Sequence, residues 1–136
     1  MNILILCTGN SCRSQMAKTF LQSFDKSLKV FSAGTDSMEI VNPFAIRVMQ
    51  EIGIDIIQNK TESINQYLVD EWDYVITVCG KANKVCPPFT GIVKQRWHLG
   101  FDDPSEKTGS DDEKVAAYRN IRDEIREAFY AFYSSQ

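Results

Sequence analysis

Short apolar runs alternate along the chain with longer stretches in which apolar residues recur at helical spacing. Residues 3–6 are all aliphatic and lead into a glycine-containing loop, which predicts a strand buried on both faces. After that loop, apolar side chains recur three and four positions apart and predict a helix from about residue 14 to residue 25. Residues 29–32 then predict a second strand, which Ala33 and Gly34 close.

The middle of the chain carries two predicted helix starts. Asn42 followed by Pro43 predicts a helix with Asn as the N-cap and Pro at the first helical position, and Gly53 is expected to end it. The core-facing residues of this helix are predicted to be Ile46, Met49 and Ile52. Further along, Thr61 is expected to cap a short helix whose apolar residues are Ile64, Leu68 and Val69.

The second half of the chain repeats the alternation. Residues 74–78 are β-branched and aromatic and predict a third strand, which Cys79 and Gly80 break. Residues 94–97 predict a weaker fourth strand, followed by a polar loop over residues 98–109. A long amphipathic C-terminal helix is predicted from the spacing of Val115, Tyr118, Ile121, Ile125, Phe129 and Phe132.

Strands that alternate with helices predict an α/β fold with a four-stranded parallel sheet flanked by helices. In such a sheet, ligands bind beyond the carboxyl ends of the strands. Cys7 follows the first strand, Cys79 follows the third, and Asp103 lies in the loop after the fourth. We therefore expect these three reactive side chains to converge on one edge of the sheet.

Composition narrows the class of protein. The 136 residues, 43% of them hydrophobic, are expected to form one domain over residues 1–136 that needs no disulfides for its stability. A net charge of −3 argues against a nucleic-acid partner. The first residues lack the features of a secretory signal, and no apolar stretch is long enough for a membrane span. We expect a cytoplasmic protein whose four cysteines are catalytic, redox-active or metal-binding.

The loop after the first strand reads Cys-Thr-Gly-Asn-Ser-Cys-Arg-Ser over residues 7–14. A short loop that wraps into a helix N-terminus turns its backbone N–H groups towards one point, which makes a cradle for a tetrahedral oxyanion. Arg13 is expected to grip two oxygens of that anion, and Cys7 to become a thiolate in the same field, helped by a hydrogen bond from Ser14. The candidate oxyanion-binding residues are Thr8, Gly9, Asn10, Ser11, Cys12, Arg13 and Ser14.

Other interpretations of these residues stay open on the sequence alone. Nucleotide-binding glycine loops are excluded, because the loop has neither the Gly-x-Gly-x-x-Gly pattern nor the lysine of a nucleotide P-loop. Cys7 and Arg13 taken singly are compatible with an ordinary buried residue and a surface cation. The same thiols would also suit a non-enzymatic redox sensor. A zinc site in a binding module would draw on Cys7, Cys12, Cys79, Cys86 and His98, although the cysteine spacings are not those of a zinc knuckle.

The loop resembles the active-site loop of the low-molecular-weight protein tyrosine phosphatases and, more narrowly, of the thioredoxin-coupled arsenate reductases built on that fold. Further matches are Ser32-Ala33-Gly34, Val41-Asn42-Pro43, Gly53-Ile54-Asp55-Ile56 and Gly100-Phe101-Asp102-Asp103-Pro104, so the resemblance covers nearly the whole chain. It implies a four-stranded parallel sheet with flanking helices, in agreement with the pattern above. It implies no metal and no organic cofactor.

The resemblance implies two reactions. In a phosphatase, Cys7 would attack phosphorus to form a phosphocysteine, and Asp103 would protonate the leaving oxygen. In an arsenate reductase, Cys7 would attack arsenate, Cys79 would attack the Cys7 adduct and expel arsenite, and Cys86 would then take over the disulfide. Thioredoxin or glutaredoxin would re-reduce the Cys79–Cys86 disulfide, and a flexible segment over residues 81–85 would let Cys86 approach. The resemblance favours the reductase, acting as a monomer with residual phosphatase activity.

Cys12 is expected to be a passive member of the loop. Two departures from the family pattern bear on these expectations. Some reductases bind a monovalent cation through a glutamate and an aspartate at the positions held here by Lys18 and Ser63, which argues against that site in this chain. Ser105 stands after Pro104 where true phosphatases commonly have a tyrosine, which weakens the phosphotyrosine alternative.

Overall fold

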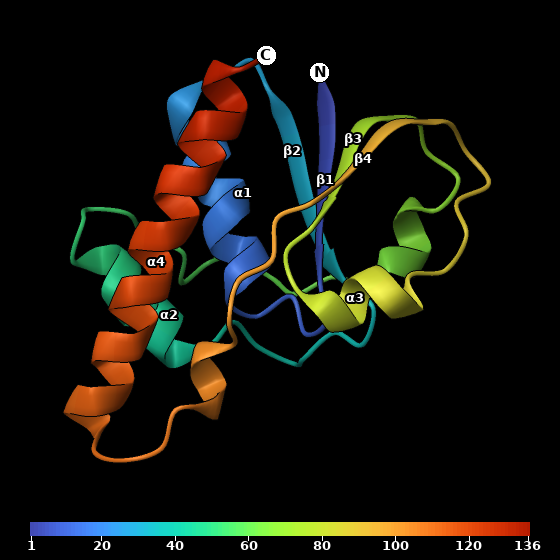
Figure 1. The fold of residues 1–136 in the computed structure, drawn as a ribbon. Helices are drawn as coiled ribbons and strands as arrows, with labels where there is room; N and C mark the ends of the chain where they lie inside the picture. Colours follow the sequence, from blue (N-terminus) through green and yellow to red (C-terminus); the bar gives the residue numbers. More distant parts are fainter.

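Four parallel strands form one sheet in the order β2-β1-β3-β4 (Figure 1). The computed structural model describes the backbone of residues 1–136 and all side chains except those of residues 81, 83 and 85. The strands are β1 (Asn2–Cys7), β2 (Lys29–Gly34), β3 (Trp72–Thr77) and β4 (Val93–His98). All four lie where the hydrophobic pattern predicts them, and the predicted fold class is confirmed.

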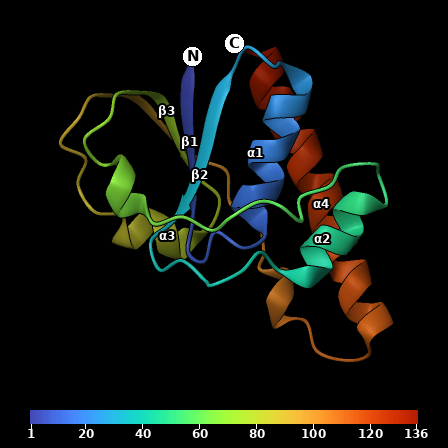
Figure 2. The same cartoon turned by 180° about the vertical axis from the view of Figure 1, so that it is seen from behind.

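Helices cover both faces of the sheet. The α-helices are α1 (Arg13–Phe24), α2 (Pro43–Gln50), α3 (Gly80–Val85) and α4 (Asp111–Ser134), and two short 3₁₀ helices are η1 (Ile64–Tyr67) and η2 (Pro104–Glu106). Figures 1 and 2 show α1, α2 and α4 together on one side of the sheet and α3 with the η1 turn on the other. None of the helices in the described part of the chain is both long and apolar enough to cross a bilayer.

Strand β1 is buried on both faces, as predicted. Ile3 and Ile5 face the larger core under α1 and α4, whereas Leu4 and Leu6 face a smaller core under η1, and all four side chains are fully buried. Alternation along a strand sends successive side chains to opposite faces, so a strand between two helix layers must be apolar throughout. This burial fixes the end of β1, and with it Cys7, in a rigid frame.

The long C-terminal helix α4 buries every residue that its pattern singles out, together with Arg122.

Helix α2 begins as predicted, with the Asn42 side chain accepting from the N–H groups of Phe44 and Ala45. Its predicted buried stripe is wrong in part, because Ile46 and Ile52 are only half-buried. The fully buried residues are Ala45, Val48 and Met49. The helix ends at Gln50, and Gly53 follows in a turn with a φ of 79°.

The short helix predicted after α2 is present as the 3₁₀ helix η1, but its details differ from the prediction. Its cap is Ser63 rather than Thr61, whose hydroxyl donates to the Met38 carbonyl instead. Val69 lies outside that element and is 73% exposed. Residues 81–85, for which no helix was predicted, belong to α3, whose first flanking residue is Cys79 and whose last is Cys86. The predicted flexibility of this segment stays a prediction.

Because all four strands are parallel, their carboxyl ends lie at the same edge of the sheet. The loop after β1, the segment after β2, helix α3 after β3 and the loop after β4 all lie along this edge, opposite the edge where the N-terminus begins β1 (Figure 1). Segments that are far apart in the sequence therefore meet beside Cys7.

Candidate active site

The carbonyl groups of the loop that joins β1 to α1 accept hydrogen bonds from the segments around it, and these bonds hold the loop in place. Residues 35–42, which follow β2, run beside the loop and donate four backbone hydrogen bonds to it. The bonds run from Thr35 N to Cys7 O at 3.1 Å, from Asp36 N to Thr8 O at 2.9 Å, from Met38 N to Gly9 O at 2.8 Å and from Asn42 N to Ser11 O at 2.8 Å. Helix α1 takes the other two carbonyls, because Gln15 Nε2 donates to Asn10 O and Met16 N donates to Cys12 O, each at 3.0 Å.

With all six carbonyls of residues 7–12 turned outward, the N–H groups of the loop are left for a ligand. In the described part of the chain, the N–H groups of residues 9–14 donate to no other protein group. They belong to the loop and to the first turn of α1, where unpaired N–H groups and the helix dipole both favour an anion. The backbone thus presents unpaired N–H groups where the loop sequence predicts an oxyanion cradle.

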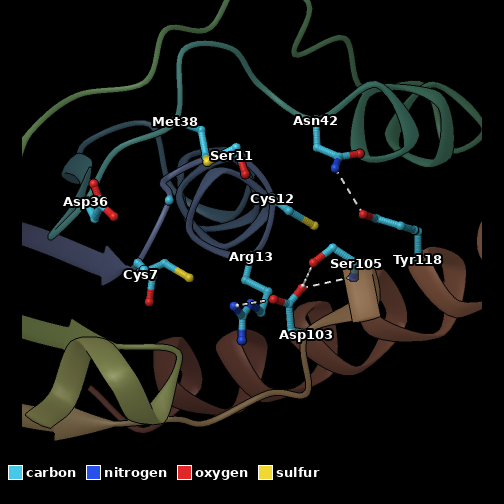
Figure 3. A pocket seen from close by; sticks show the side chains of 12 residues that line it. Cys7, Ser11, Cys12, Arg13, Asp36, Met38, Asn42, Asp103, Ser105 and Tyr118 are labelled. Atoms are coloured by element: carbon cyan, nitrogen blue, oxygen red, sulfur yellow. Dashed lines mark hydrogen bonds and ion pairs between the residues drawn. The ribbon is translucent and has the colours of Figure 1, made fainter. Parts of the chain in front are cut away.

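A cavity of about 240 Å³ opens over this loop (Figure 3). Its lining residues are Cys7, Thr8, Gly9, Ser11, Cys12, Arg13, Asp36, Met38, Asn42, Asp103, Ser105 and Tyr118. The sequence pattern does not identify five of these as site residues: Asp36, Met38, Asn42, Ser105 and Tyr118. They come from the segment after β2, from η2 and from α4, which reach the loop only in the folded chain.

Asn10 is the residue at which the backbone of the loop turns sharply. Its φ of 52° lies in the left-handed region, which Asn tolerates better than other residues with a side chain, and it is fully buried. Ser14 Oγ donates to Asn10 Oδ1 at 2.8 Å, so the expected hydrogen bond from Ser14 to the Cys7 sulfur is wrong. Ser14 holds the loop in shape rather than the nucleophile.

Cys7 ends β1, and Cys79 follows the neighbouring strand β3 as the N-cap of α3, so both thiols lie at the same end of the sheet. The Cys79 thiol also lies 3.2 Å from Thr8 Oγ1 and accepts from the N–H of Ala82 at 3.4 Å. The hydrogen bond from Cys7, with those from Thr8 and Ala82, lowers the pKa of Cys79 to about 4. The same bond to Cys79, together with burial, raises the pKa of Cys7, and Arg13 and the Thr8 N–H oppose that rise. The two shifts favour the thiolate at Cys79 over the thiolate at Cys7.

Arg13 and Asp103 meet at the opposite side of the cavity. Arg13 Nη1 donates to the Phe101 carbonyl at 2.9 Å, and Arg13 Nη2 lies 3.6 Å from Asp103 Oδ2. Asp103 caps η2, and its Oδ1 accepts from the N–H of Ser105 at 2.9 Å and from its hydroxyl at 2.7 Å. Because Oδ1 accepts both of these hydrogen bonds, Oδ2 is the Asp103 oxygen that faces Arg13.

The two remaining cysteines have different surroundings. Cys12 lines the cavity, and burial raises the pKa of its thiol to about 12, so it stays protonated. Cys86 lies half-buried at the far end of α3, with its thiol donating to the Pro87 carbonyl at 3.5 Å. Burial raises the pKa of Cys86, and the nearby Arg96 guanidinium opposes that rise.

A zinc site is not formed by these residues. Among the side chains that the structure describes, no group of three or more His, Cys, Asp or Glu residues could hold a metal ion. His98 ends β4, where its Nδ1 is hydrogen-bonded to Thr77 Oγ1 at 2.8 Å.

Residues 2–135 match the family described as low molecular weight phosphotyrosine protein phosphatase, and the chain belongs to that family. The chain is 46% identical over 131 residues to an arsenate reductase of Halalkalibacterium halodurans, a match that covers 96% of this chain and 93% of the relative. It is 43% identical over 124 residues to an arsenate reductase of Bacillus subtilis, a match that covers 90% and 88% of the two chains.

The fold has a close structural counterpart. The structure of an arsenate reductase in its phosphate-binding state superposes with a TM-score of 0.81 at 27% identity, covering 98% of this chain and 97% of that one. The family recognised from the loop sequence is thus confirmed by the whole chain.

The packing of Gly34 under the loop gives a first test of the cradle. A Cβ at this position would lie 2.6 Å from the Thr8 carbonyl oxygen and 3.1 Å from the Asn10 nitrogen. We predict that Gly34→Ala displaces the loop and weakens the binding of inorganic phosphate by at least about tenfold, measured by isothermal titration calorimetry. Gly80→Ala is the matched control, because nothing lies within 4 Å of its Cβ. Phosphate binding as tight in Gly34→Ala as in the wild type would show that the loop is not held in this way.

Thr8 gives a test of the thiolate. A thiolate cannot donate, so Thr8 Oγ1 must donate to Cys79, and we predict that Thr8→Val raises the pKa of Cys79 by about one unit. Cys79 reacts with iodoacetamide only as the thiolate, so its alkylation rate falls as the pH drops through the pKa, and this fall should come at a higher pH in the variant. Thr19→Val, which removes a hydroxyl bonded within α1, is the control. The prediction fails if the two variants and the wild type share one pH profile.

Proposed function

We propose that this chain reduces arsenate to arsenite with its own cysteines. The observation that carries the proposal is a second thiol, Cys79, at the same end of the sheet as Cys7, where it lies 3.2 Å from Thr8 Oγ1 and accepts from the N–H of Ala82. Phosphate ester hydrolysis needs a nucleophile, a cradle and an acid, and has no use for that second thiol. The names of the two relatives reported above support the same reaction.

In the first step, the oxyanion sits in the cradle and the Cys7 sulfur attacks arsenic. Transfer of the Cys7 proton to Cys79 along their hydrogen bond frees the Cys7 thiolate for this attack. Arg13 and the loop N–H groups hold the oxygens and stabilise the added charge. Asp103 gives a proton from Oδ2 to the departing oxygen, which leaves as water, and a Cys7–arsenic bond replaces the arsenic–oxygen bond.

In the second step, Cys79 returns its proton to solvent and attacks the Cys7 sulfur. The sulfur–arsenic bond breaks, and its electron pair stays on arsenic, which is thereby reduced from arsenate to arsenite. Cys7 and Cys79 are oxidised to a disulfide. Cys7 ends β1 and Cys79 follows the neighbouring strand β3, so the two thiols start this step from the same end of the sheet.

The third step transfers the disulfide outward. Cys86 attacks the Cys79 sulfur, Cys7 leaves as a thiolate, and a Cys79–Cys86 disulfide forms without net oxidation. These residues flank α3, and seven helical steps separate them by about 10 Å, whereas bridged cysteines have Cα atoms about 4.4–6.8 Å apart. Helix α3 must therefore unwind, which a six-residue helix can do at low cost. Thioredoxin or glutaredoxin then reduces the exposed disulfide.

Phosphatase activity through a Cys7 phosphocysteine is the second candidate. It is favoured by the cradle together with Asp103, which lies where an acid can reach the leaving group. It needs neither Cys79 nor Cys86, so substitutions at these positions separate the two reactions.

Turnover tests the proposal directly. We predict arsenate-dependent oxidation of NADPH in the presence of thioredoxin and thioredoxin reductase, and its loss in Cys79→Ser. Hydrolysis of p-nitrophenyl phosphate should remain measurable in that variant, because Cys7, Arg13 and Asp103 are intact. Absence of arsenate turnover in the wild type, alongside ester hydrolysis that survives Cys79→Ser, would favour the phosphatase.

The order of the thiols gives a further prediction. Without Cys86 the disulfide cannot move on, so Cys86→Ser should accumulate a Cys7–Cys79 disulfide after one turnover with arsenate. Peptide mapping by mass spectrometry under non-reducing conditions identifies the bridge. Finding these two cysteines still reduced once arsenite has been released would contradict the proposed relay.

A further inference from the structure

One residue that lines the cavity, Tyr118, has no role in the proposed reaction. Tyr118 projects from α4 into the cavity and is only 2% exposed. Its ring stacks on Phe44, with 5.3 Å between the centroids and 24° between the planes. The two packed rings fix the direction of the phenol, so its hydroxyl is a preformed feature of the cavity rather than a side chain free to turn away.

The hydrogen bond between Asn42 and Tyr118 can run in one direction only. Asn42 Oδ1 caps α2 by accepting from the N–H groups of Phe44 and Ala45, at 2.8 and 3.3 Å. Asn42 Nδ2 is therefore the atom that faces the phenol, 3.0 Å from it, and an amide nitrogen only donates. Tyr118 is the acceptor in this bond, and its own hydroxyl proton is available for another partner.

No hydrogen-bond acceptor for that proton is found among the residues that the structure describes. Figure 3 shows the Tyr118 hydroxyl and the Cys12 sulfur turned towards one another across the cavity, and a thiol is a weak acceptor. Burial raises the pKa of Tyr118 to about 12, so the phenol stays neutral and keeps its proton at any physiological pH. A buried donor without a strong acceptor is costly unless a ligand or water supplies one.

The cavity has room for such a ligand beyond the cradle. Its volume of about 240 Å³ equals that of roughly eight water molecules, more than a tetrahedral oxyanion in the loop would fill. If the cradle holds the oxygens that face the loop, an oxygen directed away from Cys7 would point towards the rest of the lining, which includes Ser105 of η2 and Tyr118 of α4. The Asp103 carboxylate lies in that part of the lining beside the Arg13 guanidinium and repels an anion when ionised, so a neutral donor there is favourable.

We propose that Tyr118 is a further oxyanion-binding residue, whose hydroxyl donates to the oxygen that the bound oxyanion directs away from Cys7. The assignment rests on the oxyanion cradle of the proposed function. The added hydrogen bond favours a ligand with a fourth oxygen over a ligand without one. The bond is direct or passes through one water, and removal of the hydroxyl costs affinity in either case. Asn42 is the positioning residue that keeps the phenol proton pointing into the cavity.

Binding of inorganic phosphate by isothermal titration calorimetry tests this assignment without any turnover. Tyr118→Phe keeps the ring and its stacking on Phe44 and removes only the oxygen. We expect this variant to bind phosphate about fivefold more weakly or worse, because a hydrogen bond to a charged ligand is lost. Tyr74→Phe is the matched control, since Tyr74 is also a buried tyrosine whose hydroxyl donates to a side chain, that of Gln136, away from the cavity. Its phosphate affinity should stay within about twofold of the wild type.

Thermal unfolding without phosphate accompanies each titration, so that a loss of folded protein is not mistaken for a loss of binding. A merely structural role would lower the melting temperature of Tyr118→Phe and leave phosphate affinity of the folded protein unchanged. Wild-type affinity in Tyr118→Phe, or an equal loss in Tyr74→Phe, would overturn the assignment. A wild type that binds phosphate in a Tyr118-dependent manner but does not reduce arsenate would refute the proposed function and leave this assignment standing.

Discussion

The site depends on one constraint, the outward orientation of the six carbonyl groups of residues 7–12. Four of them are held by the backbone of residues 35–42, and two by α1. Once these carbonyls are bound outside, the opposite ends of the same peptide units must point into the loop, where they can hold an anion. Gly34 belongs to this constraint, because only a residue without a side chain lets β2 end so close to the Thr8 carbonyl.

The same constraint would let a chain with a net charge of −3 bind the proposed anion. The cradle uses backbone dipoles, one guanidinium and a helix N-terminus, all within a few residues, so the charge elsewhere on the surface matters little. The same edge of the sheet carries α3, which has Cys79 at its first end and Cys86 at its last. In the proposed reaction, a rigid loop handles the oxyanion and a short, easily unwound helix handles the disulfide.

The sequence predicts the parts of this structure that depend on local periodicity and misses those that depend on distant contacts. The strands and α4 follow from apolar spacing, and the cradle from the loop between β1 and α1. Helix α3 was missed because residues 80–85 begin with Gly and show no apolar period. Ser14 was assigned the wrong acceptor because the left-handed turn at Asn10 is not visible in the sequence. Tyr118 appears in the pattern only as a core residue, since its partner Asn42 is 76 positions away.

The central claim is that the chain itself supplies the two electrons that convert arsenate to arsenite, and a single turnover of the fully reduced wild type tests it most directly. Arsenate is added in excess without any external reductant, released arsenite is quantified, and the disulfide is located by non-reducing peptide mapping. The account predicts one arsenite per chain and a bridge between Cys79 and Cys86, with Cys7 and Cys12 still free. No arsenite, with all four cysteines remaining reduced as they are in the resting structure, would contradict it.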